Sequence, residues 1–437
     1  MKREDPIYQT YVQILEEELC PALGCTEPIA LAYAAALVRR ALGREPEEMR
    51  VQVSGNLMKN AKSVVVPNTG GLRGIEASVA AGAGAGDPDR ALEVISEVDD
   101  TGRAAIRALL QRVPIRVERL ESPEVLDLVV EVQGGGDSAA VRITNRHTNV
   151  VSLTRNGEVL PLPGEGAENQ GEEAPRADRS LLSVERIVDF ADTVELDDVR
   201  EVLERQMEYN MAIAEEGLSG EYGAGIGRTL LEDGESLKNK VKVMAAAGSD
   251  ARMSGCERPV VINSGSGNQG ITASVPVVVW AREKGYSHDK LLRALALSNL
   301  LAVHQKAYIG VLSAYCGAVS AGCAAAGAIA YLEGCGYDGV AHTVVNALAI
   351  TSGVICDGAK PSCAGKIAVA VESGILGYQM YRQGRQFWSG DGIVTKGVDN
   401  TIRNVGALAR DGMKETDRKI VELMLENLAA PPEQGSC

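Results

Sequence analysis

Three cysteines in the last third of the chain have the residue type and the spacing for a metal site. Cys316 precedes Cys356 by forty positions, and Cys356 precedes Cys363 by seven, across the segment Asp-Gly-Ala-Lys-Pro-Ser. Thiolates suit iron-sulfur clusters and zinc, and this spacing is not the paired CxxC of a zinc ribbon. The alternative is that all three are small core residues, because free cysteine is among the most buried residue types.

A fourth cysteine, Cys25, lies at or just before the start of a predicted helix. Unpaired backbone N–H groups at a helix start lower the pKa of a thiol and make it nucleophilic or basic. The alternative is a half-buried loop cysteine. We assign no task to the five remaining cysteines, although Cys437, at the chain end, could also cap a metal cluster; the other four are Cys20, Cys256, Cys323 and Cys335.

A glycine-rich segment from Asn263 to Gly270 follows a predicted strand and precedes a helix, which matches the GxGxxG pattern of dinucleotide sites. Such a site continues into a second strand, but residues 286–305 predict another helix, so we reject a nicotinamide cofactor. We interpret the segment as a nest of backbone N–H groups for a small carboxylate, with a plain tight turn as the alternative. Its candidate substrate-binding residues are Ser264, Gly265, Ser266, Gly267 and Asn268.

Three further polar residues are candidate substrate ligands. His147 lies among polar neighbours between two predicted strands, where a histidine can bind substrate or move a proton. Asn56 and Lys59 follow another predicted strand and could hold an amine or a carboxylate. The alternatives are a structural histidine and a solvated lysine.

Composition narrows the class of protein. The net charge of −15 argues against nucleic acid or an anionic membrane as the main partner, so a small anionic substrate would need a local positive site. No apolar run at the N-terminus resembles a signal peptide, and nine cysteines, an odd number, indicate reduced thiols and a cytoplasmic protein. The uncharged run 307–332 is rich in Ala and Gly and predicts a buried central helix, not a membrane span.

The elements that position these residues predict an α+β fold in two domains. Residues 1–162 form an α/β domain with a mixed sheet, with strands near 50–54, 63–67, 114–120, 126–132, 139–144 and 149–154. Residues 80–87 predict a loose turn. Residues 163–179, poor in large apolar side chains, form an acidic loop or linker. Residues 180–437 form an all-α domain that carries the three cysteines, with helices near 195–216, 236–247, 271–284, 289–308, 314–333, 339–354, 363–382 and 415–428.

Seven segments together resemble a known family. The sequence is similar to the iron-sulfur-dependent L-cysteine desulfidases, relatives of the α chain of the iron-sulfur L-serine dehydratases, over nearly its whole length. The matching segments are GCTEPIALA (24–32), SGNLMKN (54–60), VPNTG (66–70), HTNV (147–150), NSGSGNQGI (263–271), LSAYCGA (312–318) and ICDGAKPSCAGK (355–366). Asn68 departs from an expected glycine, but asparagine tolerates the left-handed conformation.

The resemblance implies a carbon-sulfur lyase of cysteine catabolism. Cys316, Cys356 and Cys363 would ligate a [4Fe-4S] cluster, and Cys25 would be the proton acceptor. The fourth iron would be open to substrate, and its resting ligand is left undecided among Cys25, Cys437, water and substrate. L-Cysteine would yield pyruvate, ammonia and sulfide at a site between the two domains.

Three alternatives stay open at this point. The same cluster could serve an L-serine dehydratase, or the chain could be a non-catalytic iron-sulfur or zinc protein. Pyridoxal phosphate enzymes perform the same elimination through a Schiff-base lysine, and the sequence shows no persuasive context for one. We expect a small amino acid as the substrate and neither nucleic acid nor membrane as a partner; whether the chain forms a homodimer is left open.

Overall fold

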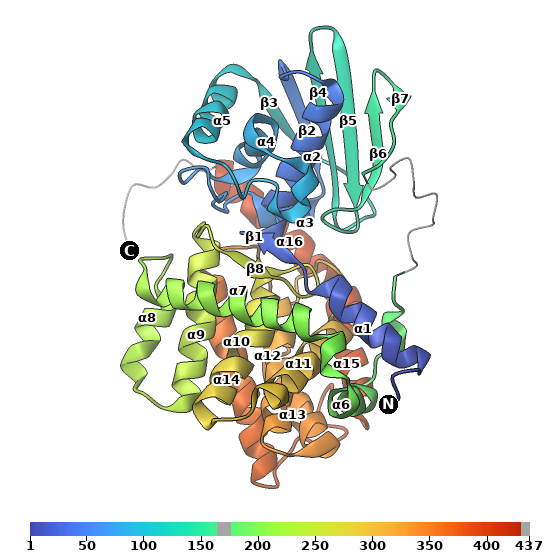
Figure 1. The fold of residues 1–437 in the computed structure, drawn as a ribbon, viewed down its shortest axis with the longest axis vertical. Helices are drawn as coiled ribbons and strands as arrows, with labels where there is room; N and C mark the ends of the chain where they lie inside the picture. The colour runs from blue at the N-terminus through green and yellow to red at the C-terminus, as the bar shows by residue number, and fades with distance from the viewer. Residues whose placement is uncertain (164–175, 430–437) are drawn as a thin grey trace.

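The computed structural model describes residues 1–163 and 176–429 and has two parts, a mixed sheet with its helices and a larger helical assembly (Figure 1). This arrangement confirms the predicted α+β fold. Residues 164–175, most of the predicted linker, and residues 430–437, with Cys437, lie outside the described residues.

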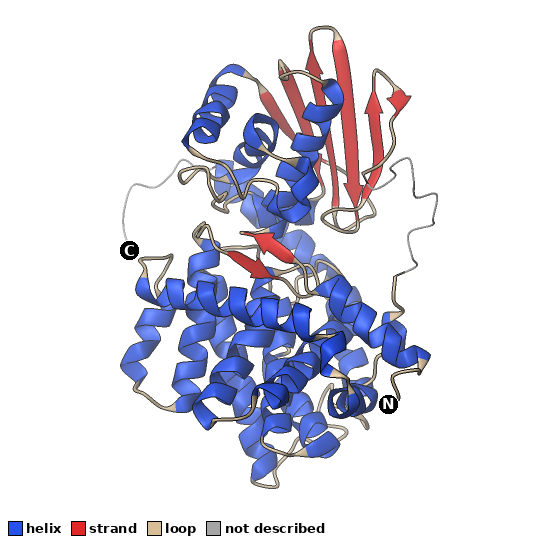
Figure 2. Cartoon of the chain, viewed as in Figure 1, coloured by secondary structure: helices blue, strands red, loops and turns tan. Residues whose placement is uncertain are grey.

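The sheet of the first part has six strands in the order β3-β2-β4-β5-β6-β7. Its mixed character comes from one parallel pair, β2 with β3, among antiparallel neighbours. Apolar residues alternate along the strands, and the buried face of β4 and β5 packs against α2, so one face of the sheet is covered by helices (Figure 2). The strands are β2 (Glu48–Val53), β3 (Ile115–Arg119), β4 (Asp127–Gly134), β5 (Asp137–Thr144), β6 (Val150–Arg155) and β7 (Glu158–Val159).

Two expectations for the first part are wrong. Residues 63–67 form no strand but a single bridge between Val65 and Arg73. Residues 80–85 are not a turn but the end of α4, because their glycines serve close packing: a Cβ on Gly82 would lie 1.9 Å from the carbonyl oxygen of Ala32 on α2. The helices are α2 (Thr26–Leu42), α3 (Gly55–Ala61), α4 (Gly74–Ala85), η1 (Pro88–Glu93) and α5 (Asp100–Arg112).

The second part is built around α12, the small-residue helix predicted to be buried. It packs against α10, α11, α13 and α14, and its glycines allow close approach, since a Cβ on Gly322 would lie 2.7 Å from the Cβ of Ala370. None of the helices in the described ranges is both long and apolar enough to traverse a bilayer. The main helices are α6 (Val184–Thr193), α7 (Arg200–Ser219), α8 (Ile226–Leu230), α9 (Leu237–Met253), α10 (Gly267–Lys284), α11 (His288–Ile309), α12 (Gly317–Leu332), α13 (Gly336–Thr351), α14 (Ser362–Arg382) and α15 (Val398–Ala407).

The two ends of the chain cross between the parts. The first helix, α1 (Pro6–Glu18), packs against α11 of the helical part, and its Tyr8 and Tyr11 rings contact Phe190 of α6. The last helix, α16 (Lys414–Ala429), packs against α3 of the sheet part. Between the parts lies a two-stranded antiparallel ribbon, β1 (Pro21–Leu23) with β8 (Pro259–Val261), so the second part is not purely helical (Figure 1).

Candidate active site

One cavity of about 100 Å³ brings together most of the residues singled out in the sequence. We call it the cysteine cavity. Its walls come from the start of α2, the loop before β6, the turn before α10 and the loops around α12 and α14. The predicted residues that line it are Cys25, His147, Ser264, Gly265, Ser266, Asn268, Cys316, Cys356 and Cys363.

Backbone segments before α12 and before and at the start of α14 position the three candidate cluster ligands, Cys316, Cys356 and Cys363. Cys316 precedes the first turn of α12 and Cys363 lies in the first turn of α14. Cys356 is tied to the first loop because its N–H donates to the carbonyl of Ala314 (2.6 Å), while the N–H of Cys316 donates to Val354 (3.2 Å). The cavity therefore unites thiols that are forty-seven positions apart in the sequence.

The thiols lie close enough to affect one another electrostatically. Burial and, to a smaller extent, the thiols of Cys356 and Cys363 together raise the pKa of Cys316 to about 12, while the positive charge of Lys366 opposes this. Lys366 itself is held by the carbonyl of Ile355 (2.9 Å) and by Asp357. A metal that replaces the protons would relieve the cost of three buried thiolates.

The donor set of the cysteine cavity consists of three thiols, a residue type that binds iron-sulfur clusters. Within the described ranges, no three His, Cys, Asp or Glu side chains converge as a single metal ion requires. A [4Fe-4S] cluster makes a different demand, because each thiolate binds a different iron. The cavity also contains buried polar atoms without a hydrogen-bond partner among the described residues, which is typical of a site that takes a ligand; they are Asn60 Oδ1, His147 Nε2, Asn268 Oδ1 and Gln269 Oε1.

Cys25 is paired with a carboxylate that the sequence did not single out. Its Sγ donates to Glu27 Oε2 (3.1 Å), and Asn60 donates to the other oxygen of Glu27 (3.0 Å). Burial raises the pKa of Cys25 well above its ordinary value, and the Glu27 charge raises it further, while Arg252 lowers it. The expectation that the helix start lowers the pKa of this thiol is therefore wrong, since burial and Glu27 outweigh the N–H groups.

Glu27 stays charged despite full burial. Burial acts to raise its pKa, but His147 and the hydrogen bond from Cys25 lower the pKa to about 2. The His147 ring lies beside it, with Nε2 3.9 Å from Glu27 Oε1, which is an ion-pair distance and not a hydrogen bond. Cys25 and Glu27 thus share a hydrogen bond, and His147 lies beside Glu27 without one.

The glycine-rich turn has a strained residue, Ser264, and is held by two side-chain hydrogen bonds. Ser264 and Gly265 both have positive φ angles, 49° and 77°, and a serine adopts that conformation only where its surroundings hold it. Thr26 Oγ1 donates to the carbonyl of Gly265 (2.9 Å), and Ser264 Oγ donates to Asn263 Oδ1 (2.8 Å). The turn leads into α10, and the following element is the helix α11, as the sequence predicted.

Gly267 makes room for a buried arginine. A Cβ on Gly267 would lie 2.3 Å from Nε of Arg252. That Nε donates to the carbonyl of Gly24 (3.0 Å), next to Cys25, and the side chain lines the cysteine cavity. The cavity therefore contains a fixed positive charge that the sequence did not reveal.

Three predicted ligands, Gly267, Lys59 and Asn56, lie outside the cavity lining. Lys59 Nζ donates to Asp417 Oδ1 of α16 (2.6 Å) and to the carbonyl of Cys356 (3.4 Å). It therefore stabilises the loop that contains Cys356 without lining the cavity. Asn56 lines a neighbouring pocket that contains Asp417 as well. The next residue on α3, Asn60, reaches the cavity instead.

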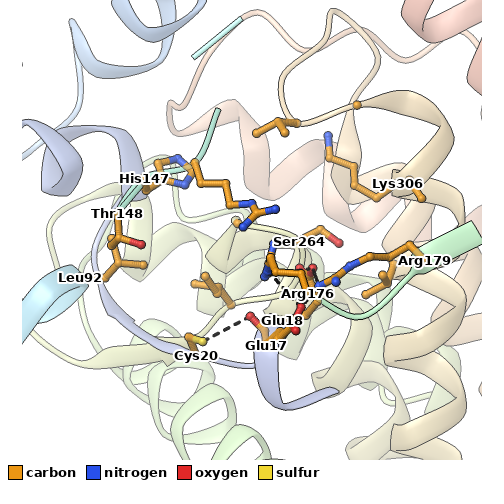
Figure 3. A pocket seen from close by; sticks show the side chains of 17 residues that line it. Glu17, Glu18, Cys20, Leu92, His147, Thr148, Arg176, Arg179, Ser264 and Lys306 are labelled. Carbon is orange, nitrogen blue, oxygen red and sulfur yellow. Dashed lines mark hydrogen bonds and ion pairs between the residues drawn. The ribbon is translucent and has the colours of Figure 1, made fainter. Parts of the chain in front are cut away.

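A larger pocket of about 400 Å³ adjoins the cysteine cavity, and we call it the outer pocket (Figure 3). His147, Ser264, Gly265, Lys306 and Val311 line both. Its far side contains two arginines and two glutamates that pair with each other: Arg179 binds Glu17 and Glu18 (2.6 Å each), and Arg176 binds Glu17 (3.0 Å).

Comparison with known proteins places the chain in a family. A family model described as the serine dehydratase alpha chain matches residues 89–422, most of the chain, and the chain belongs to that family. The match supports a lyase-type function.

Three similar bacterial proteins match nearly the whole chain. They are UPF0597 proteins of Desulfitobacterium hafniense (53% identical, covering 98% of this chain and 100% of the relative), Finegoldia magna (46%, 96% and 100%) and Treponema denticola (45%, 96% and 98%). The resemblance to serine dehydratase-like proteins is thereby confirmed, while cysteine desulfidase activity stays a prediction.

Proposed function

We propose that the protein is a non-redox iron-sulfur lyase that removes the β-substituent of a small amino acid, with L-cysteine as substrate. The observation that carries the proposal is the cysteine cavity itself, because it joins three thiols for a cluster to the Cys25–Glu27 pair. The products would be pyruvate, ammonia and sulfide. L-Serine is the alternative substrate, favoured by the description of the matching family.

Cys316, Cys356 and Cys363 would hold a [4Fe-4S] cluster. When bound, the cluster would supply a Lewis-acidic iron for the leaving group. Arg252 and Lys366 support this assignment, because their charges favour the thiolate form of Cys363 against the burial that raises its pKa. Lys59 would keep the Cys356 loop in place through the carbonyl of that residue.

Cys25 and Glu27 would move the proton of Cα. The thiol holds its proton at rest, so Cys25 can take up the Cα proton only after it passes its own proton to Glu27, 3.1 Å away. At rest this transfer is unfavourable, because burial and Glu27 raise the pKa of Cys25 while the pKa of Glu27 is lowered to about 2, and only Arg252 acts in the opposite direction on Cys25. The proposal therefore requires that bound substrate lower the pKa of Cys25. His147 lines both spaces and would return the proton to the outer pocket.

The turn from Ser264 to Asn268 would orient the substrate, and the walls of the cavity would keep water away from the proton transfer. Loss of the Cα proton and of the β-substituent leaves an enamine, which water converts to pyruvate and ammonia.

The decisive experiment measures pyruvate and sulfide from L-cysteine and L-serine side by side, with protein reconstituted anaerobically. Equal amounts of pyruvate and sulfide from L-cysteine, with little pyruvate from L-serine, support the desulfidase. Pyruvate mainly from L-serine would assign the same site to an L-serine dehydratase. No pyruvate from either substrate, with iron and sulfide bound, contradicts the proposal.

Two variants test the role of the thiol. Cys25→Ala is expected to retain bound iron and to lose turnover by a factor of roughly 100 or more, the scale of general acid-base catalysis. Cys256→Ala is the matched control, since Cys256 is equally buried but does not line the cavity. Equal turnover in both variants would remove Cys25 from the mechanism.

A further inference from the structure

Lys306 lies in the last turn of α11, lines the outer pocket (Figure 3) and lines the cysteine cavity as well, so it marks the boundary between them. Only 8% of the residue is exposed. No hydrogen bond or ion pair joins its ammonium group to another residue in the described ranges. A buried cation without a direct hydrogen-bond or ion-pair partner is costly, so this position favours an anion in the adjoining space.

The carboxylates near Lys306 are already committed to other groups. Glu27 accepts hydrogen bonds from Cys25, Thr26 and Asn60. In the outer pocket, Glu17 and Glu18 are neutralised by their two arginines. Arg146 also lines the outer pocket, so the linings of the two spaces contain more cationic groups than carboxylates, and Lys306 is the cation that lines both.

The same boundary contains groups suited to an α-amino acid. The strained Ser264–Gly265 turn and His147 line both spaces together with Lys306. Glu27, a buried carboxylate beside His147, lies on the cavity side. A small amino acid at the boundary would thus meet the unpaired ammonium group of Lys306, with His147 and the Ser264–Gly265 turn beside it.

We propose that Lys306 binds the α-carboxylate of the substrate and so selects amino acids that carry a free carboxyl group. The inference rests on the proposed function and refines it, because it names the residue that recognises the part of the substrate away from the leaving group.

The pKa of Lys306 fits this role. Burial lowers it to about 8, although the Cys356 and Cys316 thiols and Glu27 act to raise it. A carboxylate bound beside the ammonium group would compensate the burial that lowers its pKa.

The test uses two ligands that have no leaving group and cannot react. L-Alanine carries the α-carboxylate, and L-alaninamide replaces it with a neutral amide. Calorimetric titration of the full-length, anaerobically reconstituted protein at pH 7 gives both dissociation constants, and the ratio reports carboxylate recognition. The variants are Lys306→Met, which keeps the length without the charge, and Lys306→Arg, which keeps the charge.

Lys306→Met is expected to weaken L-alanine binding by a factor on the order of 10 to 100, the scale of one charge-assisted hydrogen bond, and to leave L-alaninamide unchanged. Lys306→Arg is expected to retain most of the preference for L-alanine. Lys242→Met is the matched control, because Lys242 is also largely buried but pairs with Glu372 (2.9 Å) away from both spaces.

Three outcomes would overturn the inference: no L-alanine binding to the unaltered protein, an unchanged preference in Lys306→Met, or loss of iron from that variant, which would assign Lys306 to the cluster. These measurements need no turnover. If neither L-cysteine nor L-serine gives pyruvate while L-alanine still needs Lys306, the proposed reaction fails and the carboxylate site stands.

Discussion

The ion pair between Lys59 and Asp417 ties the last helix to the cysteine loop, and breaking it should be costly. The Lys59 side chain is 1% exposed and that of Asp417 is 14% exposed, at an Nζ–Oδ1 distance of 2.6 Å. Asp417→Asn would leave a buried ammonium group without its counter-charge. Removing one partner of a buried pair costs about 3–5 kcal/mol, and we expect the lower end because water reaches Asp417.

The assay is thermal unfolding of the metal-free and reconstituted forms. A loss of about 3 kcal/mol corresponds to a fall in melting temperature of roughly 6–12 °C for a domain of this size. Glu415→Ala on the same helix is the control, because its pair with Arg418 is exposed on both sides and is worth less than about 1 kcal/mol.

The double variant Lys59→Met with Asp417→Leu should recover most of the stability, since neither charge is then buried alone. Asp417→Asn melting within 2 °C of the unaltered protein, or a double variant as unstable as the single one, would refute this account of the helix.

Three further predictions concern the cavity and the packing beneath it. The pKa of Glu27 is lowered in the folded protein, so its charge stabilises the fold above the unfolded pKa of about 4.5. That contribution, about 3 kcal/mol, is lost as the pH falls toward 2. Glu27→Gln should therefore flatten the curve of unfolding free energy against pH in this range, and parallel curves for the variant and the unaltered protein would contradict the prediction. Cys356→Ala should lower bound iron after reconstitution, whereas Cys335→Ala, outside the cavity lining, should not; equal iron in both would count against the ligand assignment. Gly270→Ala would place a Cβ 2.0 Å from the carbonyl oxygen of Val261 and should cost at least about 3 kcal/mol in a urea titration; a cost under 1 kcal/mol would show that β8 and α10 can separate freely.

Much of the fold could be predicted from the periodicity of apolar residues and from the residue types that favour turns. Alternating strands and long apolar helices were predictable because burial imposes their periods locally. Asn68, for example, takes the left-handed conformation (φ 59°) that its place in the turn requires. The glycines of α4 were misread because a glycine that permits helices to approach has the same letter as one that bends a turn, and only the partner Ala32 distinguishes them.

The site residues that belong to a cysteine or glycine-rich motif were predictable from the sequence. Single charged residues such as Glu27 and Lys306 were not. Asn60, and not Lys59, reaches the cavity because neighbours on a helix point about 100° apart, and the sequence does not say which face is inward. Glu27 and Lys306 were missed, although each is a charged residue within a strongly apolar helix. Lys306 is the only Lys, Arg, Asp or Glu between residues 294 and 309, and that isolation was the available signal.

The crossing of the chain ends has a consequence for dissecting the protein. Cut between residues 163 and 176, the first fragment would carry α1 away from Phe190 and α11, and the second would carry α16 away from α3. Each fragment would expose an apolar surface that the other one covers. The two halves should therefore aggregate when produced separately and reassemble when produced together. The protein should thus be suited to fragment complementation.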